Sequence, residues 1–174
     1  MTKHWIRAGI AGLVVALGVS TTAWGDSNSR PRRAGARLDG FQENPSITTT
    51  GRGTLMLRLD HETETIEYEL SYSGLEGTAT VGHIHTSRSR VNGPISVFLC
   101  GGAKEACPAQ EGTVKGVIEA AEIAAGSATA QGLNTFDEFV SALRARALYA
   151  NVHSSMWGSG EIRGQIFETF RRDD

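Results

Sequence analysis

Apolar and polar residues alternate along two neighbouring segments near the middle of the chain. In residues 54–60 leucines alternate with mostly polar neighbours, and in residues 66–72 the alternation is complete. A period of two residues is typical of strands that bury one face. The polar residues 61–64 between the two segments predict a hairpin loop, in which His61 is most simply a solvated turn residue.

Other segments extend this strand pattern, and one segment departs from it. In residues 135–146 apolar side chains recur at helical spacing, and Thr135 with Glu138 forms an S/T-x-x-E capping box. We therefore expect one amphipathic helix inserted among about seven or eight strands. The further segments with strand length and composition are residues 78–86, 95–100, 113–119, 147–153 and 161–168.

Composition agrees with an all-β fold. The chain has 21 Gly and 4 Pro, and Gly weakens helix interiors while it favours turns and bulges. Charged residues make up 21% of the chain and the formal net charge is -2, which excludes a disordered tail and argues against a nucleic-acid partner. Short strands at this spacing predict a single β-sandwich or barrel, and we find no internal repeat, P-loop or βαβ pattern.

The first 25 residues are typical of a secretory signal peptide. A basic stretch containing Lys3 and Arg7 precedes the uncharged apolar residues 8–19, and residues 23–25 supply small residues for cleavage after Gly25. The apolar run is shorter than the ~20 residues of a membrane span, although a retained anchor is the alternative. We expect a secreted or periplasmic protein with no membrane span after cleavage.

The rest of the chain divides into three parts. Residues 26–34 are polar and rich in Arg, and we expect them to form a flexible lead-in. Residues 35–168 hold the domain, and residues 169–174 form a charged tail. The arginines between positions 30 and 37 are most simply a solvated basic arm, with a surface-binding patch as the alternative.

Export gives the two cysteines a structural interpretation. Cys100 and Cys107 flank a short loop that begins with two glycines, and thiols pair in an oxidising compartment. We expect a local disulfide that stabilises the domain by about 2.5 kcal/mol. A thiolate metal or redox site is the weaker alternative, because the spacing matches neither the CxxC motif nor common zinc sites.

Three histidines are the strongest candidates for chemistry. His83 and His85 lie two residues apart on an expected strand, so they share a face about 6.6 Å apart and can reach one metal ion. His153 ends another expected strand, on the same face as Tyr149 and Asn151. The three imidazoles can converge if the two strands are neighbours or face each other.

This histidine set favours copper, with zinc as the alternative. Imidazole suits both metals, and the affinity order of divalent ions places Cu(II) first. Strand histidines are also often hydrogen-bonded framework groups without a metal.

Hydrolase machinery is not evident in the sequence. Ser154 and Ser155 follow His153 directly, but no G-x-S-x-G motif surrounds them. Glu43, Asp60 and Glu161 could pair as acid and base, yet solvated surface carboxylates explain them equally well.

Several motifs, in their order along the chain, resemble the CHRD domain. This domain is the repeat first described in chordin, and it is also found alone in exported bacterial proteins. The resemblance covers about residues 36–168. The matching motifs are residues 38–45 (LDGFQENP), 49–53 (TTGRG), 82–85 (GHIH), 92–95 (NGPI), 149–153 (YANVH) and 160–166 (GEIRGQI).

The resemblance implies an immunoglobulin-like or superoxide-dismutase-like β-sandwich. It implies less about function, because the chordin repeats belong to an extracellular antagonist of growth factors and the single-domain bacterial members have mostly no assigned role. An extracellular or periplasmic protein partner is therefore one expectation.

A weaker likeness connects the chain to copper/zinc superoxide dismutase. His83, His85 and His153 match that family's copper-binding histidines in order, and Arg163 matches its active-site arginine. The chain lacks the bridging histidine, the zinc-binding loop and the long-range disulfide of that family.

Our leading hypothesis is therefore an exported protein that binds copper through three histidines for storage, delivery or sensing. A structural or protein-interaction module without metal is the second hypothesis. A copper enzyme of superoxide-dismutase type, in which Arg163 steers the anion, is the third.

Overall fold

The computed structural model describes residue 1 and residues 32–168. The predicted signal peptide, the lead-in up to residue 31 and the tail over 169–174 lie outside this described part. Two helices, α1 (Ala120–Ala125) and α2 (Phe136–Arg144), and two 3-10 turns, η1 (Gly40–Gln42) and η2 (Ser127–Gln131), accompany the strands. The strands are β1 (Arg32–Asp39), β2 (Arg52–Asp60), β3 (Thr65–Ser73), β4 (Ala79–Thr86), β5 (Ile95–Cys100), β6 (Gly112–Glu119), β7 (Leu148–Ser154), β8 (Ile162–Gln165) and β9 (Phe167–Glu168).

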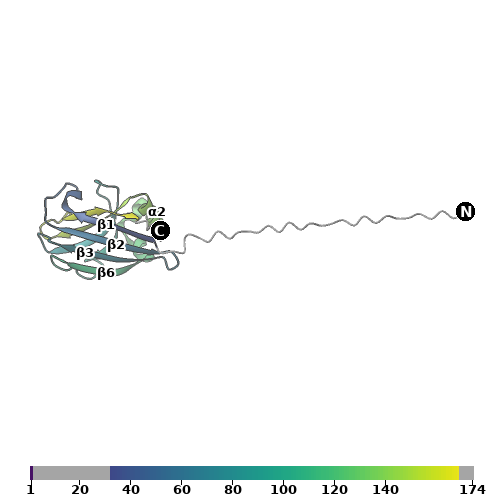
Figure 1. Cartoon of the computed structure of the whole chain (residues 1–174), viewed down its shortest axis with the longest axis horizontal. Coiled ribbons are helices and arrows are strands. Elements are labelled where there is room, and N and C mark those ends of the chain that lie inside the picture. The colour runs from purple at the N-terminus through teal and green to yellow at the C-terminus, as the bar shows by residue number, and fades with distance from the viewer. Residues whose placement is uncertain (2–31, 169–174) are drawn as a thin grey trace.

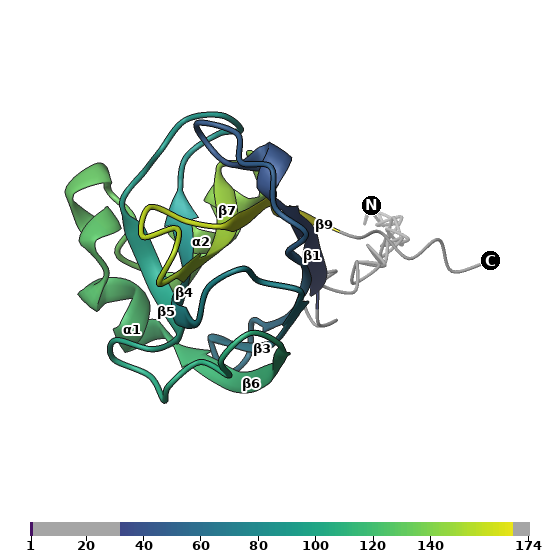
Figure 2. The same cartoon turned by 90° about the vertical axis from the view of Figure 1, so that its left-hand side faces the viewer.

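All nine strands belong to one antiparallel sheet in the order β5-β4-β7-β8-β1-β2-β3-β6, with β9 also paired to β1. β1, β2, β3 and β6 form one layer of the molecule (Figure 1). The sheet curls around the core (Figure 2), and its two end strands, β5 and β6, come into contact. The all-β prediction is confirmed, and the expected sandwich is realised as one continuous, nearly closed sheet.

The core lies inside this curled sheet. Leu55, Leu57 and Leu59 point inward from β2, and Ile84 and Val152 point inward from β4 and β7. These are the alternating apolar positions of their strands, and full burial of one such side chain stabilises the fold by about 1.5–3 kcal/mol. The other face of each strand remains available for chemistry.

The predicted helix is confirmed as α2, and its start follows the predicted capping box. The Thr135 hydroxyl accepts the Glu138 backbone N–H at 3.2 Å, and the Glu138 carboxylate accepts the Thr135 N–H at 3.0 Å. The short helix α1 was not predicted. Its six residues are too few for a helical period to be detected. No helix within residues 32–168 has the length and apolarity to cross a membrane.

The structure also differs from the sequence expectations at β1 and at His61. β1 begins at Arg32, inside the expected lead-in, because Ala34 and Leu38 point into the core. These inward side chains include small alanines, so the alternation was weak in the sequence. His61 is half-buried instead of solvated, and its ring packs edge-on against Phe136 at 5.1 Å.

The predicted disulfide joins Cys100, at the end of β5, to Cys107. We expect its loss to lower the free energy of unfolding by about 2.5 kcal/mol, because the bridge restricts the unfolded chain. Urea unfolding of the Cys100→Ala/Cys107→Ala variant should show this decrease. The wild-type protein under a reductant is the matched control, and its free energy of unfolding should decrease by the same amount. An unchanged urea midpoint after reduction would contradict the prediction.

Candidate metal centre

The pairing of β4 with β7 brings the predicted histidines together. In the antiparallel register His83 lies opposite Asn151 and His85 lies opposite Tyr149, while His153 follows two residues further along β7. All five side chains project from the outer face of the sheet, because the intervening residues of both strands point into the core.

The three imidazoles are close enough to share an ion. Their candidate ligand atoms all lie within 4.8 Å of one another. Ligands bound tetrahedrally at the usual 2.0 Å are about 3.3 Å apart, so a metal ion would draw the rings inward by at most ~1.5 Å. The ring centroid of His83 lies 5.1 Å from that of His85 and 5.0 Å from that of His153.

Backbone carbonyls set the tautomers of two of these rings. His85 Nδ1 lies 2.9 Å from the Gly93 carbonyl oxygen, and His153 Nδ1 lies 2.9 Å from the Gly158 carbonyl oxygen. A carbonyl oxygen only accepts, so each Nδ1 carries the proton and donates it. The Nε2 atom of each neutral ring is therefore left with a free lone pair, as in many histidine metal ligands.

The two Nε2 atoms meet at the side chain of Asn151. Asn151 Oδ1 lies 3.1 Å from His85 Nε2 and 2.9 Å from His153 Nε2, while Asn151 Nδ2 donates to Glu43 Oε1 at 3.3 Å. In this arrangement two nitrogen lone pairs and one amide oxygen face one another with no donor between them. A cation satisfies all three acceptors at once.

His83 completes the cluster with a buried and unpaired ring atom. Among the described residues its Nδ1 has no hydrogen-bond partner, which is uncommon for a buried polar atom. Burial, followed by the neighbouring His153 and His85, lowers the pKa of His83 to about 3. Burial also lowers the pKa of His85 and of His153. The three rings are thus neutral at physiological pH, as metal ligation requires.

Arg163 supports the site from behind Tyr149. Its guanidinium carbon lies 3.4 Å from the centre of the Tyr149 ring, and the same ring stacks on His85 with a centroid distance of 4.8 Å. Because β4 and β8 flank β7 on opposite sides, the two groups contact opposite faces of Tyr149. Arg163 is 1% exposed and donates to the side chain of Asn92 and to the carbonyls of Arg88 and Val91. In this structure it anchors the covering loop instead of facing solvent.

The carboxylates of Glu43 and Glu161 are buried, which corrects the expectation of solvated surface groups. Glu43 is 6% exposed, and Glu161 is fully buried and accepts from Thr49 and from the Glu76 backbone N–H. Asp60 lies at the end of β2 and accepts backbone N–H groups of the following turn. Burial raises the pKa of Glu43 to about 7, against the opposing effects of its Asn151 hydrogen bond and the nearby Arg163 charge.

Gly160 permits the close contact between Glu43 and Asn151. Its φ is 124°, a conformation that favours glycine. A Cβ atom at this position would lie 2.3 Å from Asn151 Nδ2 and 2.5 Å from Glu43 Oε1. Any larger residue would therefore force this hydrogen-bonded pair apart.

A family model described as the CHRD domain matches residues 34–166. The chain belongs to the CHRD family. The predicted membership is thus confirmed over most of the chain. Comparison with curated proteins and comparison with solved structures each found no match.

The sequence segments that carry the resemblance to the CHRD domain meet around the histidine cluster. The GHIH and YANVH motifs supply the rings and Asn151, and the GEIRGQI motif supplies Gly160 and Arg163. The remaining contacts come from Glu43 of FQENP and Gly93 of NGPI. Sequence reasoning placed the histidines, but it did not assign Glu43, Gly93 or Gly158 to the site.

Glu43 should give the metal-free CHRD domain a distinctive pH dependence. Because its folded-state pKa is raised, the folded protein binds more protons than the unfolded chain between pH 4.5 and about pH 7. This contribution to stability is present at low pH and is lost as the pH rises through that window. The Glu43→Gln variant lacks this proton-linked contribution. Its free energy of unfolding, relative to that of wild type, should therefore rise by about 2–3 kcal/mol between pH 5 and pH 8.

Urea unfolding in the presence of a chelator measures this difference. The exposed Glu62 provides a matched control, because Glu62→Gln makes the same substitution at a side chain that is not buried. The lowered histidine pKa values act in both proteins and cancel in the comparison. A constant difference between Glu43→Gln and wild type across this pH range would contradict the assignment.

Proposed function

We propose that this CHRD-family protein is exported and binds one copper ion through His83, His85 and His153, for storage, delivery or sensing. The observation that supports the proposal best is the convergence of the His85 and His153 lone pairs with Asn151 Oδ1. All three atoms are acceptors, and their nearest neighbours hold them in place. A bound cation removes this conflict.

The donor set favours copper over the alternative, zinc. Imidazole nitrogens with an amide oxygen suit Cu(II) and Zn(II), and Cu(II) binds a given set of such ligands more tightly. The soft thioether of Met156, which would favour Cu(I), is 59% exposed. The ligands are neutral, so the buried Glu43 carboxylate is the nearby group able to balance the charge of the ion.

Binding is favoured over dismutase-like catalysis by the position of Arg163. An arginine that steers an anion must present its guanidinium to solvent. Arg163 is enclosed between Tyr149 and the loop over residues 87–93. Its contacts fit a role in holding that loop over His85.

Copper binding can be followed through Trp157, which is the single tryptophan of a chain that begins at Asp26. It precedes Gly158, whose carbonyl orients His153. Titration with Cu(II) should quench the Trp157 fluorescence with a stoichiometry near one. The His83→Ala/His85→Ala/His153→Ala variant should weaken binding at least 100-fold, since it removes three of the ligands.

His61→Ala is the matched control, because His61 packs against Phe136, and it should bind Cu(II) like wild type. Circular dichroism should show that both variants are folded. Equal affinity of the triple variant and wild type would refute the copper site. Tighter binding of Zn(II) than Cu(II) in a competition experiment would instead select the alternative metal.

The affinity for Cu(II) should depend weakly on pH between 7.5 and 5.5. Three histidines with the ordinary pKa of 6.5 would lose about 1000-fold in affinity over this range, because protons compete for each ligand. The pKa of His83 is lowered to about 3, and those of His85 and His153 are lowered as well. His83 should contribute almost nothing to the loss, and His85 and His153 should each contribute less than the roughly tenfold loss of an ordinary histidine. We therefore expect a loss below about 100-fold, measured by calorimetry in buffers that do not bind copper. A 1000-fold loss would contradict the buried, neutral site.

A further inference from the structure

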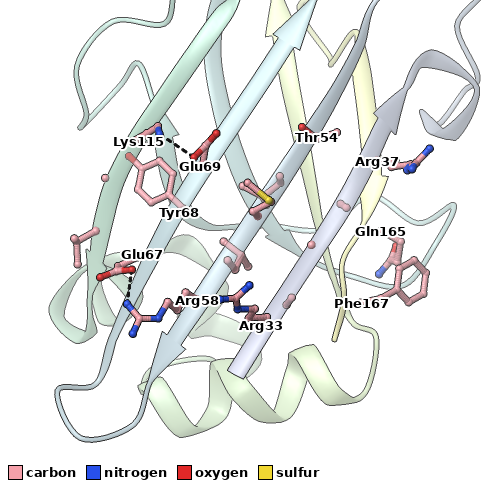
Figure 3. A pocket seen from close by; sticks show the side chains of 18 of the residues that line it. Arg33, Arg37, Thr54, Arg58, Glu67, Tyr68, Glu69, Lys115, Gln165 and Phe167 are labelled. Carbon is pink, nitrogen blue, oxygen red and sulfur yellow. Dashed lines mark hydrogen bonds and ion pairs between the residues drawn. The ribbon is translucent and has the colours of Figure 1, made fainter. Parts of the chain in front are cut away.

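The outer face of β1, β2, β3 and β6 carries a second candidate site, on strands other than the histidine-bearing β4 and β7. A hollow of about 1170 Å³ lies over this face. Its side chains project from the strands toward the viewer in Figure 3, with Phe167 of β9 at one side. Met56 and Phe167 are 57% and 44% exposed, which is unusual for large apolar side chains on one continuous surface.

The apolar part of this face has a gap over Gly35, where β1 carries no side chain. Gly35 of β1 pairs with Met56 on one side and with Phe167 on the other. Because Gly35 has no side chain, β1 places no side chain between these two exposed apolar residues. A large apolar side chain from another molecule would fill that position and contact both.

The charged part of this face is unbalanced. Its acidic residues, Glu67 and Glu69, are already paired with Arg58 and Lys115 at 3.0 Å (Figure 3). Arg33 and Arg37 have no ion pair within residues 32–168. Arg33 also lies directly opposite Arg58 in the register, and like charges at directly opposite positions repel each other.

Together these features define a symmetric pattern along β1, with an arginine on each side of a glycine. Arg33, Gly35 and Arg37 occupy alternate positions and project from the same face. The two arginines are about 13 Å apart, the distance between residues i and i+4 of any extended chain. An extended segment that lies along β1 would place three of its own side chains over these positions.

We propose that this face docks an extended acidic segment of a partner protein with the pattern acidic-x-apolar-x-acidic. The two acidic side chains pair with Arg33 and Arg37, and the apolar side chain between them fills the gap over Gly35. The pattern is symmetric, so the segment can run in either direction. Charge complementarity selects such a partner, since this face has four basic and two acidic side chains on a chain of net charge -2.

The test uses the whole chain and a fluorescein-labelled peptide containing Glu-Thr-Leu-Thr-Glu, with fluorescence anisotropy as the readout. A chelator is present throughout, so the outcome does not depend on the proposed copper site. The Arg33→Gln/Arg37→Gln variant should bind at least tenfold more weakly than wild type, and Met56→Ser should weaken binding several-fold. The control Arg144→Gln, at an exposed position on α2, should leave the affinity unchanged.

A second peptide containing Glu-Leu-Thr-Thr-Glu keeps the acidic spacing but moves the leucine out of the gap, and it should bind at least fivefold more weakly. Equal binding of both peptides, or an equal loss in Arg144→Gln, would overturn the proposal. Binding to phosphatidylglycerol vesicles without binding to the peptide would also overturn the proposal, because it would indicate that this face binds a membrane surface. A dimer in sedimentation that Met56→Ser dissociates, or tighter peptide binding after truncation at Glu168, would assign the face to this chain itself.

Discussion

The antiparallel pairing of β4 with β7 determines the position of every group in the histidine cluster. A strand presents alternate residues to one face, so the register that buries Ile84 and Val152 also places three imidazoles and Asn151 on the opposite face. A shift of one residue would move these polar side chains into the core. The apolar contacts that stabilise the fold therefore also hold the ligands in place.

The outer face becomes a site because loops bury it. Most outward sheet positions are exposed, but the histidine cluster is covered by three loop segments. These are residues 40–46, 87–94 and 155–160. Their carbonyl groups select the tautomers, and the desolvation they cause keeps the rings neutral. The sheet supplies the spacing of the ligands, whereas the loops supply their protonation state.

Sequence analysis predicted most of the strands, the capped helix, the disulfide and the three histidines, because each has a local signal. It could not predict which strands pair, so the meeting of His153 with His83 remained conditional until the structure was known. β1 was missed because small alanines occupy inward positions and arginines dominate its composition. The burial of Glu43 could not be predicted, because its partner Asn151 lies 108 residues away in the chain.

The place of β1 in the sheet has a consequence for how the chain folds. β1 is the first strand within residues 32–168, and it lies between β2 and β8, which is completed only at residue 165. The half of the sheet that carries the histidines is therefore joined to the other half by pairings between the two ends of the domain. Such non-local contacts make folding slow, and they can form only after the whole domain has been synthesised.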